Sequence, residues 1–105
     1  MYVDDHVLAI ERIFDQGIIG ETYNIGGGYE ISNLELVYKI IEIYDDLYPS
    51  DFNFKELISF INDRKGHDFR YSIDSSKIQS QLDWSPKIKF DEGIKTTINW
   101  FKNKN

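Results

Sequence analysis

The chain has 105 residues, of which 41% are hydrophobic and 15% aromatic, so it suits one small domain with an apolar core and not a disordered chain. The net charge of −6 argues against nucleic acid and against an anionic membrane surface as partners, because both need a basic footprint. The lack of cysteine excludes a disulfide framework and is compatible with a cytoplasmic location, which we expect. No apolar run reaches the length of a membrane span.

A helix is predicted at the start of the chain. Four apolar residues recur there at helical spacing: Val3, Val7, Ile10 and Phe14. Gly17 marks the predicted end of this helix. Asp4, Asp5 and His6 could be read as metal ligands, but consecutive residues do not share a helix face. We therefore interpret them as a charged helix N-terminus, where negative charge suits the helix dipole.

A strand, a glycine turn and a helix start are predicted between residues 22 and 37. Thr22–Ile25 is aromatic and β-branched, as in a short buried strand, and the glycines at 26–28 allow a sharp turn. Ser32 followed by Glu35 has the spacing of a capping box. Backbone N–H groups at such a helix start favour an anion, so a phosphate-binding loop is one interpretation. An ordinary turn is favoured, because Ile31 occupies the last glycine position of the G-x-G-x-x-G pattern.

A second helix is predicted over Asn33–Tyr48, with its apolar residues on one face and Pro49 directly after it. Two strands are predicted further along, over Leu57–Ile61 and Phe69–Ile73. The intervening loop is basic in an otherwise acidic chain, with Arg64, Lys65 and His67 in it, and Arg70 follows in the second predicted strand.

This basic loop has two interpretations that the residues leave open. Guanidinium and imidazole donors match phosphate oxygens, so the loop could clamp a diphosphate. Alternatively, it is a solvated hairpin in which Asp63 and Asp68 pair with the cations.

The last third of the chain is predicted to hold two helices. Asp74 caps a short helix that runs through Leu82, and the break follows at Trp84-Ser85-Pro86. Lys87–Phe90 is predicted to be extended, and Asp91 to cap a final helix. Three apolar residues share a face of that helix: Ile94, Ile98 and Phe101.

Common catalytic patterns are missing from the sequence. No tyrosine is followed four positions later by lysine, and Ser-His-Asp and Cys-His sets have no support. Two distant histidines without cysteine make a zinc site improbable. We therefore expect no catalytic residue and no metal ligand in this chain.

Four segments resemble the C-terminal part of the dTDP-glucose 4,6-dehydratases, which are extended short-chain dehydrogenases/reductases. The segments are Tyr2–His6, Gly20–Gly27, Asp63–Tyr71 and Leu82–Pro86. The third is the most specific, since the family pattern is D-R-P-G-H-D-x-R-Y. Lys65 replaces its proline here.

The resemblance implies an α/β fold in which residues 1–105 are the small substrate-binding domain, with helices on a few short strands. It also implies that Asn33, Arg64 and His67 contact a nucleotide-sugar, dTDP-glucose, around its diphosphate and nucleoside. The family enzyme is a homodimeric lyase that uses bound NAD to form dTDP-4-keto-6-deoxyglucose. Its NAD-binding Rossmann domain and Tyr-x-x-x-Lys pair would lie upstream.

We therefore expect a fragment of a larger architecture that neither binds NAD nor catalyses the reaction by itself. The abrupt start of the first helix pattern favours the same interpretation. Two alternatives stay open. One is part of a related nucleotide-sugar enzyme, such as a UDP-sugar 4-epimerase or a GDP-mannose dehydratase. The other is a standalone module that binds a nucleotide-sugar or a protein partner without chemistry.

Overall fold

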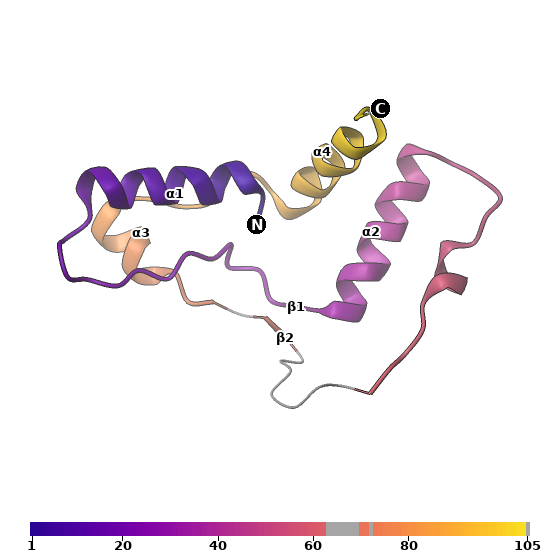
Figure 1. Cartoon of the computed structure of the whole chain (residues 1–105), viewed down its shortest axis with the longest axis horizontal. Coiled ribbons are helices and arrows are strands. Elements are labelled where there is room, and N and C mark those ends of the chain that lie inside the picture. The colour runs from indigo at the N-terminus through magenta and orange to yellow at the C-terminus, as the bar shows by residue number, and fades with distance from the viewer. Residues whose placement is uncertain (63–69, 72, 105) are drawn as a thin grey trace.

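The computed structural model describes residues 1–62, 70–71 and 73–104, and this part of the chain is mostly helical (Figure 1). Its elements, in chain order, are α1 (Val3–Gln16), β1 (Ile31–Ser32), α2 (Asn33–Leu47), the 3-10 helix η1 (Phe54–Leu57), β2 (Arg70–Tyr71), α3 (Ser76–Leu82) and α4 (Phe90–Lys102). The radius of gyration is 16.9 Å, whereas a compact domain of about 100 residues has one near 13 Å. The molecule is therefore elongated. None of its described helices is long and apolar enough to cross a bilayer.

One end of the molecule is built from α1, α3 and the segment that follows α3. Its buried apolar residues are Ala9, Ile78, Leu82 and Trp84. Ile13, Tyr23 and Ile25 pack against this cluster. Burial of a large apolar side chain stabilises the fold by about 1.5–3 kcal/mol, so this cluster is the main core of the described chain.

Two polar contacts fix α1 to the later part of the chain. The Asp5 side chain is 2% exposed, and its Oδ2 accepts hydrogen bonds from the backbone N–H groups of Lys87 (3.1 Å) and Ile88 (2.9 Å). Arg12 donates to the carbonyl oxygen of Leu82 at 2.6 Å, at the C-terminus of α3. A buried carboxylate is tolerated only when it is hydrogen-bonded, so Asp5 is a structural residue.

The other end of the molecule is formed by α2 and α4, which lie beside each other (Figure 1). Tyr48 Oη donates to Asn99 Oδ1 at 2.7 Å, and Lys39 forms an ion pair with Asp91 at 2.8 Å. The buried residues of these two helices are Ile43 and Gly93. Polar contacts at both ends of the pair therefore hold helices that bury little apolar surface against each other.

The predicted helices are confirmed, with small differences at their starts. Ser32 is the N-cap of α2, and its Oγ accepts from the N–H of Glu35 at 3.2 Å, as the capping-box spacing predicts. Asp74, which was predicted to cap α3, accepts from the N–H of Ser76 at 2.9 Å, but the N-cap residue of α3 is Ser75. The prediction that Asp91 caps the last helix is wrong: α4 begins at Phe90, and Asp91 lies in its first turn.

The predicted strands are mostly wrong. Thr22–Ile25 pairs with no strand among the described residues, and Leu57–Ile61 instead contains the end of η1 followed by irregular chain. Of Phe69–Ile73, the strand covers Arg70–Tyr71, and its partner is β1 rather than the 57–61 segment. The α/β expectation is therefore corrected, for the described residues, to a mostly helical fold with one two-residue ladder. A strand needs a partner in space, which a local pattern cannot supply.

Candidate functional site

The β1–β2 ladder joins two segments that are far apart in the sequence. The strands are antiparallel, with Ile31 opposite Tyr71 and Ser32 opposite Arg70 (Figure 1). Asn33 follows β1 directly as the first residue of α2, and the basic loop directly precedes β2. The ladder thus brings together the chain next to Asn33 and the chain next to the loop.

The start of α2 is well defined and accessible. Ser32 is 6% exposed, since its side chain turns inward to cap the helix, whereas Asn33 is exposed. The N-terminus of a helix carries partial positive charge, which favours a negatively charged group nearby. Asn33 is therefore placed where an amide side chain and the helix dipole can both act on an anion.

The glycine turn before β1 uses its glycines for two different reasons. Gly28 has φ +72°, a conformation that side chains rarely adopt. A Cβ atom at Gly26 would lie 2.8 Å from Cβ of Ile73, so this position needs glycine for close approach. The predicted sharp turn is confirmed, and it lies against the residue that follows shortly after β2.

Aromatic and charged contacts connect this turn to α4. The rings of Tyr29 and Phe90 stack with centroids 4.4 Å apart and planes 9° from parallel. Close by, the hydrogen bond from Lys39 to Asp91 raises the pKa of the lysine, and the Asp91 charge and Tyr29 act in the same direction. These contacts hold the start of α2 and the start of α4 in a defined relation.

The structure describes only one of the three predicted site residues. Asn33 lies beside the ladder as described above. Arg64 and His67 lie outside the described residues, so their predicted contacts stay predictions. Among the described residues, no three His, Asp or Glu side chains gather as metal ligands would.

Asp5 is the residue whose role sequence reasoning missed. We interpreted it as part of a charged helix N-terminus, which fits the exposed Asp4, but Asp5 is buried and holds the 87–88 segment. The helical spacing offered a signal, because Asp5, Ala9 and Ile13 recur at every fourth position and therefore share a face.

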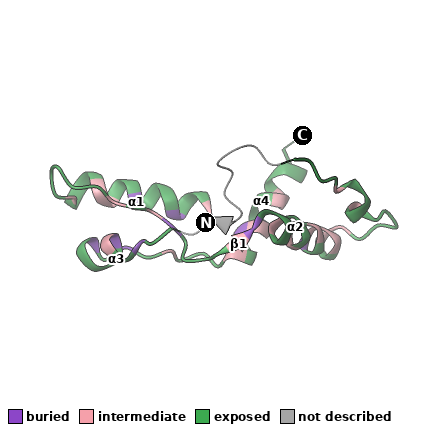
Figure 2. Ribbon diagram, turned by 90° about the horizontal axis from the view of Figure 1, so that it is seen from below, coloured by how far each residue is buried: buried purple, intermediate pink, exposed green. Residues whose placement is uncertain are grey.

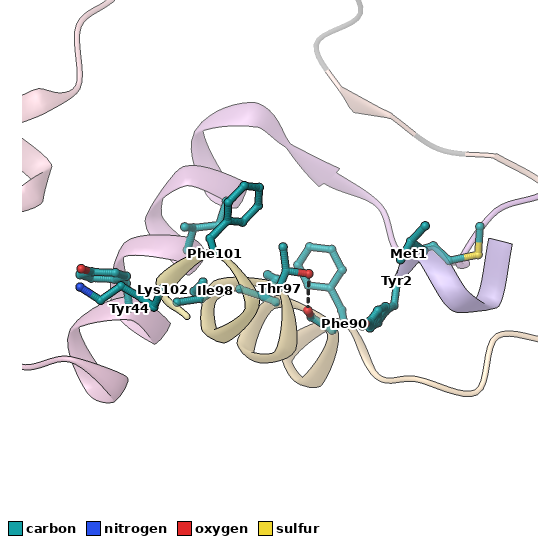
Figure 3. A pocket seen from close by; sticks show the side chains of 12 residues that line it. Met1, Tyr2, Tyr44, Phe90, Thr97, Ile98, Phe101 and Lys102 are labelled. Carbon is teal, nitrogen blue, oxygen red and sulfur yellow. Dashed lines mark hydrogen bonds between the residues drawn. The ribbon is translucent and has the colours of Figure 1, made fainter. Parts of the chain in front are cut away.

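A cavity between α2 and α4 is a different feature. It has a volume of about 650 Å³ and lies between α2, α4 and the start of the chain (Figure 3). Tyr44 and Lys102 lie at one end of it and Met1 and Tyr2 at the other (Figure 3). Its lining is mainly apolar and does not include Asn33. This cavity therefore does not suit the diphosphate that the sequence predicts.

Comparison with known proteins identifies the family. A sequence model of the family described as GDP-mannose 4,6 dehydratase matches residues 1–97. The chain therefore belongs to the GDP-mannose 4,6-dehydratase family of extended short-chain dehydrogenases/reductases.

Particular relatives within that family are dTDP-glucose 4,6-dehydratases. The chain is 43% identical to the one from Haemophilus influenzae (strain ATCC 51907 / DSM 11121 / KW20 / Rd), in a match covering 96% of this chain and 31% of the relative. It is 45% identical to one from Escherichia coli, covering 98% of this chain and 30% of the relative. The chain thus spans about a third of the length of the curated relatives that it matches.

A solved structure shows the same fold. It is the crystal structure of dTDP-glucose 4,6-dehydratase from Bacillus anthracis str. Ames in complex with NAD. The similarity has a TM-score of 0.77 at 38% sequence identity, and it covers 97% of this chain and 30% of that one.

Proposed function

We propose that residues 1–105 form the nucleotide-sugar-binding part of a dTDP-glucose 4,6-dehydratase, the C-terminal part of that enzyme. The complete enzyme would be a homodimeric lyase that converts dTDP-glucose to dTDP-4-keto-6-deoxyglucose with bound NAD. The observation that carries the proposal is the β1–β2 ladder, because it joins the two segments that bear the predicted substrate contacts.

Three side chains have proposed roles in this binding. Asn33 donates its amide to the nucleotide-sugar at the positive end of α2. Arg64 and His67 hold the diphosphate, since a guanidinium offers two parallel donors to phosphate oxygens and an imidazole adds one more. Both residues precede Arg70 by at most six positions, and the backbone of Arg70 pairs with that of Ser32. Chain connectivity therefore limits how far they can lie from Asn33.

We propose that the described residues do not bind NAD by themselves. The glycine turn departs from the dinucleotide pattern at Ile31, and the one charged side chain lining the cavity between α2 and α4 is Lys102. We propose that the NAD site and the catalytic groups belong to the part of the enzyme that this chain does not match. The described residues then contribute binding and orientation, and this chain by itself is inactive.

The test is a titration of the 105-residue chain with dTDP in which heteronuclear NMR spectra are recorded at each step. We expect signals of Asn33 and of the basic loop to shift together. Arg64→Ala is expected to weaken binding roughly tenfold or more, because a hydrogen bond to a charged group contributes about 1.5–3 kcal/mol. Lys104→Ala, in the C-terminal tail, is the control and leaves the affinity unchanged. An Arg64→Ala variant that bound dTDP as tightly as the unsubstituted chain would refute the assigned role.

A related nucleotide specificity is the second candidate, and the description of the matching family favours it. In that case this chain belongs to an enzyme acting on a GDP-sugar or UDP-sugar. The same titration with dTDP, UDP and GDP separates the two candidates. Preference for dTDP supports the first, and preference for GDP or UDP supports the second.

A further inference from the structure

The chain on both sides of Asn33 is connected to the first turn of α4. Tyr29 comes four positions before Asn33, and its ring stacks on that of Phe90 with the centroids 4.4 Å apart. Lys39 comes six positions after Asn33 and forms an ion pair with Asp91 at 2.8 Å. The two contacts thus start on opposite sides of Asn33 in the sequence and end on the first two residues of α4.

The rest of the described contact between α2 and α4 gives the start of α2 little support. The two helices lie side by side, but Figure 2 colours most of both as exposed or intermediate. Ile40 and Ile94 border the cavity between the helices. The hydrogen bond between Tyr48 and Asn99 lies towards the C-terminal ends of both helices. The position of the first turn of α2 therefore depends strongly on the stack and the ion pair.

The first turn of α4 is itself fixed to the other end of the molecule. The buried carboxylate of Asp5 accepts hydrogen bonds from the backbone of the 87–88 segment, just before α4. Gly93 lies close to Tyr2, since a Cβ atom added at Gly93 would be 3.1 Å from the Cβ of Tyr2. The two α4 residues that hold the start of α2 thus lie between two fixed points.

We propose that Tyr29 and Lys39, through their contacts with α4, are positioning residues that set where the Asn33 amide lies for the nucleotide-sugar. The inference rests on the proposed function, and it adds the contacts through which the rest of the chain determines the geometry of that site. A hydrogen bond weakens steeply as its distance and angle depart from the ideal. A displaced helix start therefore lowers the affinity although neither positioning residue has to touch the ligand.

Matched tyrosine variants of the 105-residue chain, titrated with dTDP, test the stack. Tyr29→Leu keeps an apolar side chain but removes the stack, so it is expected to weaken binding about three- to tenfold. Tyr29→Phe keeps the ring and is expected to retain the affinity. Tyr38→Leu is the control, because Tyr38 has a similar exposure, 42% against 47% for Tyr29, and its ring lies beside Lys55. Equal affinities of Tyr29→Leu and the unsubstituted chain would overturn the proposal.

An Asn33→Ala background separates positioning from direct contact. If Tyr29 acts through Asn33, Tyr29→Leu causes little further loss of affinity in that background, because the group that it positions is already gone. A loss as large as in the unsubstituted chain would show that Tyr29 acts on the ligand by another route, and it would overturn the positioning role. Circular dichroism of each variant confirms that the helices are retained.

Charge-neutral variants on the first turn of α4 test the ion pair. Asp91→Asn removes the charge that pairs with Lys39 and is expected to weaken dTDP binding about twofold, since a partly exposed ion pair contributes little. Glu92→Gln is the control, because Glu92 pairs with Lys95 within α4 and leaves the contact to α2 intact. Equal effects of the two substitutions would remove Lys39 from the proposal.

Amide hydrogen exchange without ligand separates this inference from the proposed function. Tyr29→Leu is expected to speed exchange of the Glu35 amide, which Ser32 caps, about threefold or more, while the amide of Ile43 keeps its rate. Tyr29→Phe and Tyr38→Leu should change neither rate. Unchanged exchange at Glu35 in Tyr29→Leu would overturn the positioning role while dTDP binding stands. Faster exchange there, with no dTDP binding by the unsubstituted chain, would support the positioning of Asn33 and refute the proposed function.

Discussion

The two ends of this molecule are held together in different ways. At the α1–α3 end, apolar side chains fill a small core and a buried carboxylate joins the first helix to the segment before α4. At the α2–α4 end, an ion pair and a tyrosine–asparagine hydrogen bond connect two helices that border a cavity of about 650 Å³. The first end has a packed apolar core, whereas the second has an apolar surface that the described residues do not fill.

This difference shows where stability and binding are located. Core packing contributes several kcal/mol per large side chain, while exposed ion pairs contribute little. The candidate site at β1 and the start of α2 lies between the two ends, attached to both through the Gly26–Ile73 approach and the Tyr29–Phe90 stack. The well-packed α1–α3 end thus supports the candidate site more firmly than the α2–α4 end does.

Truncation of the core isoleucine gives the largest expected effect. Ile78 is fully buried, so Ile78→Ala should reduce the free energy of unfolding by about 2–5 kcal/mol. Ile98→Ala removes the same atoms from a residue that lines the open cavity, and its effect should be less than half as large. Urea unfolding followed by circular dichroism measures both. Equal losses of unfolding free energy from the two substitutions would contradict the difference in packing between the two ends.

Removal of the buried carboxylate gives the next effect. Asp5→Ala leaves the backbone N–H groups of Lys87 and Ile88 without their acceptor, which should cost about 1–3 kcal/mol. Asp4→Ala, at the adjacent exposed position, should change the unfolding free energy by no more than about 0.5 kcal/mol. The same urea series compares them. A loss from Asp4→Ala as large as that from Asp5→Ala would show that the charge of the helix terminus matters more than the buried bonds.

The smallest expected effect is a pH dependence at the start of α3. The hydrogen bond from the Ser76 backbone N–H lowers the pKa of Asp74 below its ordinary value of 3.8, with the Ser76 side chain acting in the same direction. A carboxyl group with a lowered pKa in the folded state stabilises the fold above the unfolded pKa, and that contribution is lost as pH falls through the folded one. The urea midpoint should therefore fall more between pH 6 and pH 3 for the unsubstituted chain than for Asp74→Asn. An identical fall in both would show that the bond contributes nothing to stability.

Local signals in the sequence were sufficient for the helices. Periodic apolar residues and the Ser32–Glu35 spacing predicted α2 from its first residue, and the spacing of Val3 and Val7 predicted α1. The strand predictions were wrong because the partner of β2 is β1, which lies on the other side of α2 in the sequence. A local pattern does not identify such a distant partner. The 22–25 segment alternates as a strand does, yet it has no neighbour among the described residues to pair with.

The site could be predicted only in part. The position of Asn33 after a cap and beside a glycine turn followed from spacing, and the structure adds the ladder that brings β2 to it. The predicted contacts of Arg64 and His67 stay predictions. The role of Asp5 was missed because three consecutive polar residues were interpreted as one exposed group. Burial depends on which face of α1 meets α3, and only the folded chain decides that.

The Asp5 hydrogen bonds also set an order of assembly. Their acceptor and their donors are 82 and 83 positions apart, so closing them encloses a long loop that contains both α2 and α3. Contacts of such long sequence separation form late, because loop closure has to be completed first. During synthesis, the carboxylate of Asp5 would stay uncovered until Lys87 and Ile88 have been added to the chain. The best-packed end of the molecule can therefore be completed only after the whole of α2 has been synthesised.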